Sequence, residues 1–307
     1  MKSISIGDSP LLSSRLAYGC WRIAERDAAP GTGRRAALAA VDAGYTLFDH
    51  ADIYCDGEAE KVFGQVLKEV AGLRERVVLA TKCGIRKRGD PNPDSPYRYD
   101  FSADYISRSC EGSLRRLGVE MIDLYQLHRP DYLMDPDEVA EVLVKLRDAG
   151  KVREFGVSNF NPTQVATLQR ACGMLIRANQ VEISLANLSC FEDGTLYQCL
   201  TEQITPMAWS PLAGGLLGDG PRRILASQEA YKPAAVVAAL NALAKTRGTI
   251  RTVVALAWLL RHPSGIIPIV GSTDPERIRQ AAAADDFEMS REEWYRLLDA
   301  ARGQKLP

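Results

Sequence analysis

The chain of 307 residues has few of the features that mark membrane, secreted or nucleic-acid-binding proteins. No apolar run approaches the roughly 18 residues of a membrane-spanning helix, and the N-terminal segment mixes short apolar pairs with Ser, Asp and Pro, so no signal peptide is expected. Thirty-eight basic and 39 acidic side chains give a net charge of -1, without the basic excess that attracts nucleic acid or anionic membranes. We therefore expect a soluble, cytoplasmic protein that binds neither.

Residues that form disulfides or metal sites are also scarce. The seven cysteines are an odd number, are scattered, and include no C-x-x-C spacing. Only three histidines occur, far apart along the chain. Because disulfide frameworks and thiolate metal sites need paired or clustered ligands, we expect reduced thiols and no metal.

The glycine motifs that usually hold phosphates are missing. There is no Walker motif, and the nearest match to G-x-G-x-x-G, Gly31-Thr-Gly33, continues with Arg-Arg-Ala. This argues against a doubly wound dinucleotide-binding sheet. A nucleotide would have to be held in another way.

What the chain does contain is a repeated alternation of short apolar runs and amphipathic patterns. Strands are predicted at 16–19, 46–49, 77–82, 121–128, 154–157, 178–182, 206–210 and 266–271, and helices at 58–70, 102–117, 136–149, 162–171, 235–245 and 252–261. The strand runs show little polar alternation, as parallel strands covered on both faces do. Eight such repeats predict the α/β class and a (β/α)8 barrel, as a single domain over residues 1–307.

Some segments fall outside this repeat. Long gaps predict insertions at 84–101 and 211–232, both rich in Gly, Pro and charge. Segments 3–6 and 11–13 predict an N-terminal hairpin that plugs the barrel bottom. An extra C-terminal helix is predicted over 290–301, with Ser290 as N-cap and Glu293 completing a capping box.

Four reactive residues end or follow predicted strands: Asp49, Tyr54, Lys82 and His128. Active sites of such barrels lie at the C-terminal ends of the strands. A buried ammonium on Lys82 needs a partner, which Asp49 on the preceding strand can supply. A phenol with a pKa of about 10 is a poor acid at neutral pH, and a neighbouring ammonium lowers that pKa. A salt bridge beside an unrelated Tyr explains any one of these residues, but all four at strand ends favour an active site.

Six motifs carry a resemblance to a known family: Phe48-Asp-His-Ala-Asp-Ile-Tyr54, Ala80-Thr-Lys-Cys-Gly84, Leu127-His-Arg-Pro130, Lys151-Val-Arg-Glu-Phe-Gly-Val-Ser-Asn-Phe160, Ala178-Asn-Gln-Val-Glu182 and Trp209-Ser-Pro-Leu-Ala-Gly-Gly215. Together they resemble the aldo-keto reductases, over about residues 15–303, and look closest to a bacterial branch of predicted oxidoreductases. The resemblance implies NAD(P)H-dependent reduction of aldehydes or ketones to alcohols by direct hydride transfer, without a metal.

The resemblance also implies a role for each of the four reactive residues. Tyr54 would be the general acid in reduction, Lys82 would lower its pKa, Asp49 would orient Lys82, and His128 would position the carbonyl. Trp21, Tyr54 and His128 would contact the small-molecule carbonyl substrate. Further substrate contacts are expected in the loops, at Tyr97, Tyr99 and Phe101, near Phe191, and at 212–217.

A second set of residues would bind the cofactor, again by resemblance: Ser158, Asn159, Gln180, Trp209, Ser210, Leu212, Gly271, Ser272, Thr273, Arg277 and Gln280. Ser158, Asn159 and Gln180 would hold the nicotinamide carboxamide, and Trp209 would stack on its ring. Asp274 and Pro275 start a helix whose free N–H groups form an anion site.

The expected nucleotide is NADP, with NADPH preferred over NADH. By the same resemblance, the segment 271–280 would bind the 2′-phosphate on the adenosine ribose of NADP. Arg277, with Arg279 as a second cation, would favour that phosphate. Gly271, where many family members have Lys, and the carboxylate of Asp274 would weaken that preference.

Two other functions remain open at this stage. Some members of the family act as nucleotide-sensing binding subunits of larger assemblies. A cofactor-free barrel lyase using Lys82 as a Schiff-base amine is the other. Neither the physiological substrate nor the oligomeric state is indicated by the sequence.

Overall fold

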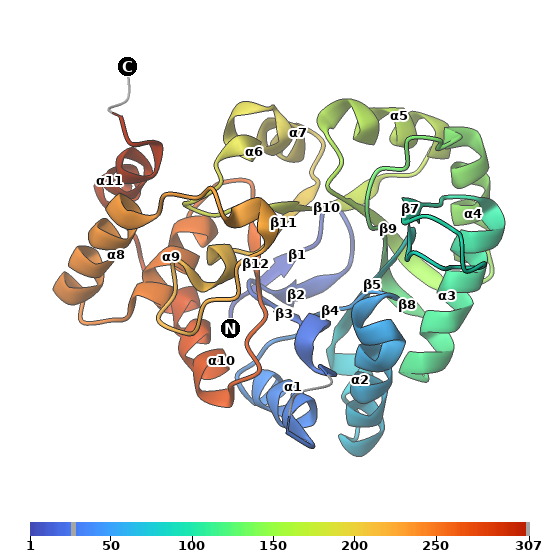
Figure 1. Cartoon of the computed structure of the whole chain (residues 1–307), viewed down its shortest axis with the longest axis horizontal. Coiled ribbons are helices and arrows are strands. Elements are labelled where there is room, and N and C mark those ends of the chain that lie inside the picture. The colour runs from blue at the N-terminus through green and yellow to red at the C-terminus, as the bar shows by residue number, and fades with distance from the viewer. Residues whose placement is uncertain (26–28, 305–307) are drawn as a thin grey trace.

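The computed structural model describes residues 1–25 and 29–304 (Figure 1). Eight parallel strands form a closed barrel: β3 (Ala17–Gly19), β4 (Leu47–Asp49), β5 (Val78–Cys83), β8 (Ile122–Leu127), β9 (Val152–Ser158), β10 (Ile176–Glu182), β11 (Thr205–Trp209) and β12 (Ile267–Val270). Each corresponds to a predicted strand, so the predicted (β/α)8 barrel is confirmed. Only boundaries differ, as where β9 begins at residue 152 rather than 154.

Helices surround the barrel on its outside (Figure 1). They are α1 (Thr32–Asp42), α2 (Glu58–Glu69), α3 (Ala103–Leu117), α4 (Pro136–Asp148), α5 (Pro162–Cys172), α6 (Ser189–Glu192), α7 (Thr195–Thr201), α8 (Ala234–Thr246), α9 (Arg251–Leu260), α10 (Pro275–Ala282) and α11 (Arg291–Arg302). None of the helices within the described ranges is long and apolar enough to cross a membrane.

Helix α1 has no counterpart among the predicted helices. Its buried face consists of Gly33 and the alanines Ala36, Ala37, Ala39 and Ala40, so no stripe of large apolar residues marks it. The missing side chain at Gly33 allows close packing, because a Cβ there would lie 1.7 Å from the carbonyl oxygen of Ile23.

The inside of the barrel changes character from its N-terminal to its C-terminal end. The predicted hairpin is present as β1 (Ser3–Ser5) and β2 (Leu12–Ser14), and its neighbours Ile6 and Leu11 pack against inward-facing residues such as Leu124 and Met207. Further along the strands, the inward positions are polar and include Asp49 and Lys82. Apolar side chains therefore close the N-terminal end of the barrel, and the polar side chains gather at the C-terminal ends of the strands, where the active sites of such barrels lie.

The C-terminal helix α11 is also confirmed. The side chains of Ser290 and Glu293 form the predicted capping box. Trp294 on this helix stacks on Trp258 of α9, with ring centroids 5.0 Å apart and planes 9° apart, and each indole N–H donates to the other residue's carbonyl oxygen. This pair fixes α11 against the barrel helices.

The first long insertion is more ordered than a loop prediction suggests. Within it, β6 (Ile85–Arg86) pairs with β7 (Arg98–Tyr99) in an antiparallel ribbon. Arg86 forms ion pairs with Asp90 at 2.9 Å and Asp100 at 2.8 Å, and so ties both sides of the insertion together.

Candidate functional site

A cavity of about 490 Å³ opens at the C-terminal ends of the barrel strands. It is within the size range of small-molecule sites. The predicted site residues that line it are Trp21, Asp49, Tyr54, His128, Ser158, Asn159, Gln180, Trp209, Ser210, Leu212, Gly271, Ser272, Thr273, Arg277 and Gln280. Lys82, the remaining member of the predicted catalytic group, lies behind the wall rather than in it.

The ammonium of Lys82 is completely buried and fully coordinated. Its Nζ lies 2.7 and 2.8 Å from the two carboxylate oxygens of Asp49, and 2.7 Å from the carbonyl oxygen of His50. It also lies 3.2 Å from the hydroxyl oxygen of Tyr54. The structure therefore brings Asp49, Lys82 and Tyr54 into one connected group.

The local chain path explains why Tyr54 reaches Lys82. Asp49 ends β4, which pairs in parallel with β5, the strand that carries Lys82. Tyr54 opens a short helical turn, η2 (Tyr54–Gly57), in which Cys55 and Asp56 have φ angles of 49° and 58°. This left-handed conformation is strained for residues other than glycine, and such strain is typical of functional sites.

The electrostatics of this group depend on its burial. Burial lowers the pKa of Lys82, but the Asp49 carboxylate and the Tyr54 phenol raise it by more, so the net shift is upward and the amine stays charged. Burial raises the pKa of Tyr54 above its ordinary value, although Lys82 acts in the opposite direction. The predicted effect of Lys82 therefore acts in the expected direction, but burial outweighs it. The phenol keeps its proton at neutral pH.

His128, which directly follows β8, lies next to Tyr54. Its ring makes an edge contact with the phenol, with centroids 5.9 Å apart and planes at 78°. Burial, together with the nearby cations Lys82 and Arg129, holds the pKa of His128 well below its ordinary value, so the imidazole is neutral. Its Nδ1 is buried and has no hydrogen-bond partner among the described residues.

A chain of hydrogen bonds continues from this group along the cavity wall. Asn159 donates to the hydroxyl of Ser158 at 2.7 Å and accepts from the indole N–H of Trp209 at 2.9 Å. Ser158 donates to the carbonyl oxygen of Gln180 at 2.8 Å. The Gln180 amide donates to Asp49 at 2.8 Å, a contact that the sequence did not suggest. The amides at the proposed nicotinamide end are thus joined directly to the carboxylate behind Lys82.

The opposite end of the cavity is formed by the start of α10. Asp274 caps this helix, accepting from the backbone N–H groups of Glu276 at 2.9 Å and Arg277 at 3.3 Å. A second oxygen of Asp274 lies 3.6 Å from the guanidinium of Arg277. Arg279 pairs with Glu276 at 3.6 Å and does not line the cavity. The structure therefore does not place Arg279 where it could help Arg277 to bind a phosphate.

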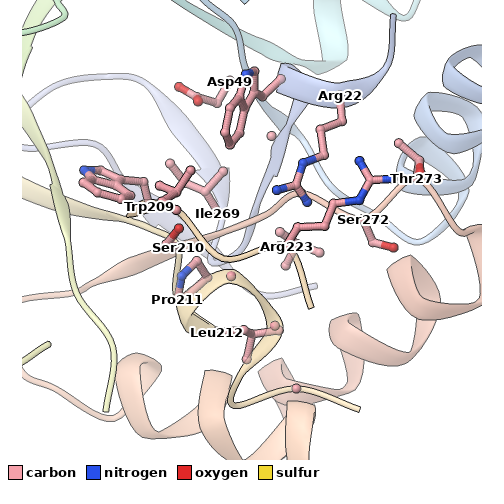
Figure 2. A pocket seen from close by; sticks show the side chains of 18 of the residues that line it. Arg22, Asp49, Trp209, Ser210, Pro211, Leu212, Arg223, Ile269, Ser272 and Thr273 are labelled. Atoms are coloured by element: carbon pink, nitrogen blue, oxygen red, sulfur yellow. The ribbon is translucent and has the colours of Figure 1, made fainter. Parts of the chain in front are cut away.

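Three further arginines line the cavity and were not predicted: Arg22, Arg129 and Arg223. Figure 2 shows the side chains of Arg22 and Arg223 running past one another near Ser272 and Thr273. The carboxylate of Glu25 lies 3.7 Å from Arg22 and 2.5 Å from Arg223, and joins the first βα loop to the long insertion.

A sequence signal existed for two of these arginines. Arg22 and Arg129 each follow a strand that ends at the cavity, which is where functional residues of such barrels gather. Arg223 lies deep in the 211–232 insertion, and only the folded path of that segment brings it to the cavity.

Several predicted substrate contacts lie elsewhere. Phe191 packs on Trp258 and Trp294, outside the cavity. Phe101 is buried and stacks on Phe160. Tyr99 belongs to the β6–β7 ribbon, and of the three aromatic residues predicted in that insertion only Tyr97 lines the cavity.

Comparison with known proteins agrees with this geometry. The model of the Aldo/keto reductase family matches residues 15–302. The chain belongs to this family. A 6-dehydroglucose reductase of Novosphingobium aromaticivorans is 44% identical, over 98% of this chain and 96% of the relative.

Solved structures of other aldo/keto reductases share the fold. The glycerol dehydrogenase of Gluconobacter oxydans matches with a TM-score of 0.86 and 28% identity, covering 98% of this chain and 95% of its own. An aldo/keto reductase of Klebsiella pneumoniae, solved with NADP and acetate, matches with a TM-score of 0.79 and 29% identity, covering 100% and 97%. As a member of this family, the chain is an oxidoreductase, and the family uses nicotinamide cofactors.

Proposed function

We propose that this aldo/keto reductase reduces an aldehyde or ketone to an alcohol with NADPH, using Tyr54 as the general acid. The observation that carries the proposal is the Tyr54 hydroxyl, which lies in the cavity wall 3.2 Å from the ammonium of Lys82. A proton donor backed by a fixed positive charge is what a carbonyl oxygen needs as it becomes an alcohol.

Each residue of the group has a distinct part in the proton transfer. Tyr54 gives its proton to the carbonyl oxygen, and Lys82 stabilises the phenolate that remains. Asp49, 2.7 Å from Lys82, keeps that lysine charged and oriented. Neutral His128 donates a hydrogen bond that positions the carbonyl oxygen, a role that a charged imidazole beside Lys82 could not take without repulsion.

The residues of the cavity fit a nicotinamide dinucleotide. Ser158, Asn159 and Gln180 offer amide and hydroxyl groups for a carboxamide, and Trp209 offers a planar ring at the same end. Arg22 and Arg223 offer positive charge for phosphates, whereas the first N–H groups of α10 are already bound by the Asp274 cap. When bound, the reduced nicotinamide supplies the hydride that the carbonyl carbon accepts.

Preference for NADPH over NADH is proposed to rest on Arg277. Its guanidinium is part of the cavity wall and can make a charge-assisted contact with a 2′-phosphate. Asp274 reduces this effect, although its carboxylate is engaged in capping α10. Gly271 offers no second cation. We therefore expect a preference that is real but moderate.

The names of two related proteins suggest the substrate. One relative is a 6-dehydroglucose reductase and one structural neighbour is a glycerol dehydrogenase. Both compounds carry several hydroxyl groups. We propose that this enzyme takes a polyhydroxylated carbonyl compound, and 6-dehydroglucose is the first compound to assay.

Mixing the purified protein with NADPH and a set of aldehydes, while following NADPH absorbance, tests the proposal. We expect turnover that the Tyr54→Phe variant loses. Tight nucleotide binding without turnover on any carbonyl would favour the sensor function. Borohydride trapping of a carbonyl compound on Lys82, in protein free of nucleotide, would favour the lyase; the burial of Lys82 and its four oxygen neighbours argue against that outcome.

A further inference from the structure

Arg129 is a charged residue of the cavity wall whose charge the protein leaves uncompensated. Its side chain has no hydrogen bond or ion pair with any residue in 1–25 or 29–304. Its guanidinium lies over an aromatic ring, with its central carbon 5.5 Å from the centroid of Trp209. The residue is half-buried.

Three neighbours define where Arg129 lies in the cavity. It directly follows His128 at the end of β8, so it lies beside the residue proposed to hold the carbonyl oxygen. Trp209, over which it lies, is itself held by the 2.9 Å hydrogen bond from its indole N–H to Asn159. Tyr97 is close enough for the charge of Arg129 to oppose the rise that burial causes in the pKa of that phenol. The guanidinium therefore lines the cavity beside Trp209, next to the residue proposed to hold the carbonyl oxygen.

The surroundings of Arg129 supply almost no acceptors. The cavity wall includes the apolar or aromatic residues Trp21, Ile53, Ile85 and Tyr97, of which Tyr97 is near Arg129. The acidic residues of the wall are otherwise engaged: Asp49 binds Lys82, Asp219 accepts from the backbone of Thr252, and Asp274 caps α10. A guanidinium carries five N–H donors and no acceptor, so its donors are available to oxygens of a substrate that displaces water from the cavity.

We propose that Arg129 selects carbonyl substrates that carry hydroxyl groups beyond the carbonyl, by donating hydrogen bonds to two neighbouring hydroxyl oxygens. This inference rests on the proposed function and assigns its substrate specificity to one residue. The forked guanidinium matches a pair of oxygens, and the rings of Trp21, Tyr97 and Trp209 provide apolar surface for the carbon chain. A site built to bind a hydroxyl discriminates strongly against the analogue that lacks it, because its donors are then left unpaired.

A carboxylate on the substrate could accept from the same N–H groups, so the experiment separates the two chemistries. The wild type and the Arg129→Met variant are compared on two matched pairs: D-glyceraldehyde against propanal, and succinic semialdehyde against butanal. The quantity measured is the ratio of kcat/KM within each pair. We expect Arg129→Met to lower the glyceraldehyde-to-propanal ratio by about tenfold to a hundredfold, mainly through KM, with propanal turnover little changed.

Two variants control for indirect effects. Arg22→Met removes a cation from the other end of the same cavity, and it should weaken NADPH binding without changing the glyceraldehyde-to-propanal ratio. Arg129→Lys keeps the charge without the fork and should restore the ratio only in part. NADPH affinity of Arg129→Met, measured by fluorescence titration, reports whether its fold is intact.

Three results would overturn the inference. These are an equal loss by Arg129→Met on glyceraldehyde and propanal, no loss on either compound, or a larger fall in the succinic semialdehyde ratio than in the glyceraldehyde ratio. If the wild type turns over no carbonyl compound at all, the proposed function fails instead. The Arg129 inference is then decided by binding: glycerol should quench tryptophan fluorescence in the wild type more strongly than 1-propanol does, and Arg129→Met should lose that difference.

Discussion

The two ends of the cavity hold their charges in opposite ways. At the proton-transfer end, the side chains of Lys82 and Asp49 are 0% and 3% exposed, and their atoms lie 2.7 Å apart. At the phosphate end, the side chains of Arg277 and Asp274 are 43% and 42% exposed and lie 3.6 Å apart. Charges at the first end form a tight buried pair, whereas those at the second are loosely paired and exposed, and so can be reached by a ligand.

This difference has physical consequences. Buried ion pairs are poorly screened by salt. Removing one partner leaves the other charge buried without a counterion, which destabilises the fold strongly. Exposed pairs are weak and screened by salt, and their loss affects the ligand more than the fold. Changes at the proton-transfer end should therefore affect both chemistry and stability, and changes at the phosphate end should affect nucleotide affinity alone.

The largest effect is expected for Lys82→Met. Removing the ammonium leaves the Tyr54 phenolate without its stabilising charge, and should lower kcat by about two to four orders of magnitude. It also leaves Asp49 buried without its cation, which should destabilise the fold by about 3–5 kcal/mol.

The double variant Lys82→Met with Asp49→Asn serves as the control for stability. Without the orphan carboxylate it should regain much of the lost stability in urea unfolding, yet remain inactive. If Lys82→Met unfolded at the same urea concentration as the wild type, the Lys82–Asp49 pair would not contribute to the stability of the fold as predicted.

A pH-dependent effect is expected at Asp52, two residues before Tyr54. Burial raises the pKa of this carboxyl to about 7, despite a hydrogen bond from Ser109 at 2.8 Å, and one of its oxygens has no partner in the described part of the chain. Because the folded state binds the proton more tightly than the unfolded state, stability falls as pH rises from about 4 to about 7.

Asp52→Asn mimics the protonated acid at every pH. Its free energy of unfolding should be close to that of the wild type at about pH 4 and exceed it by a few kcal/mol at about pH 8. Asp104→Asn, on the exposed side of α3, is the control and should show no such divergence. Parallel curves for wild type and Asp52→Asn across this range would contradict the assignment.

At the phosphate end, Arg277→Ala should weaken NADPH binding by about tenfold to a hundredfold and leave NADH binding nearly unchanged. The preference of the wild type for NADPH should also shrink as salt is added, since the guanidinium is exposed. Arg279→Ala is a close control, because it lies on the same helix but outside the cavity. An Arg277→Ala protein that loses both nucleotides equally would show that this residue does not distinguish them.

The smallest effect is expected at Cys55, whose φ of 49° is strained for a residue with a Cβ. Cys55→Gly should stabilise the fold by up to about 1 kcal/mol, whereas Cys55→Ala, which keeps the strain, should not. Thermal unfolding of the two variants checks this. A gain in Cys55→Ala as large as that in Cys55→Gly would mean that the thiol, rather than the backbone, is responsible.

The proton-transfer end was easier to predict from sequence than the phosphate end. Asp49 and Lys82 end recognisable strands, and the parallel barrel brings such ends together whatever the loops do. Tyr54 follows closely enough to share that location. Their net pKa shifts could not be predicted, because they depend on how deeply the fold buries them.

The parts that sequence did not reveal depend on loops or on small side chains. Arg223 reaches Glu25 across nearly 200 residues of chain, through an insertion whose path is set by tertiary contacts. Phe191 is an aromatic residue in the segment that follows β10, where substrate contacts are expected, yet it packs on Trp258 and Trp294 instead. Helix α1 was missed because alanines give a weak periodic signal.

The central claim is that Tyr54 donates the proton in a nicotinamide-dependent reduction, and a single variant tests it most directly. Tyr54→Phe removes the hydroxyl and keeps the ring. We expect kcat to fall by about two to four orders of magnitude, while the Kd for NADPH from fluorescence titration stays within error of the wild type. A Tyr54→Phe enzyme that keeps near-wild-type kcat, or one that loses NADPH binding together with turnover, would contradict the claim.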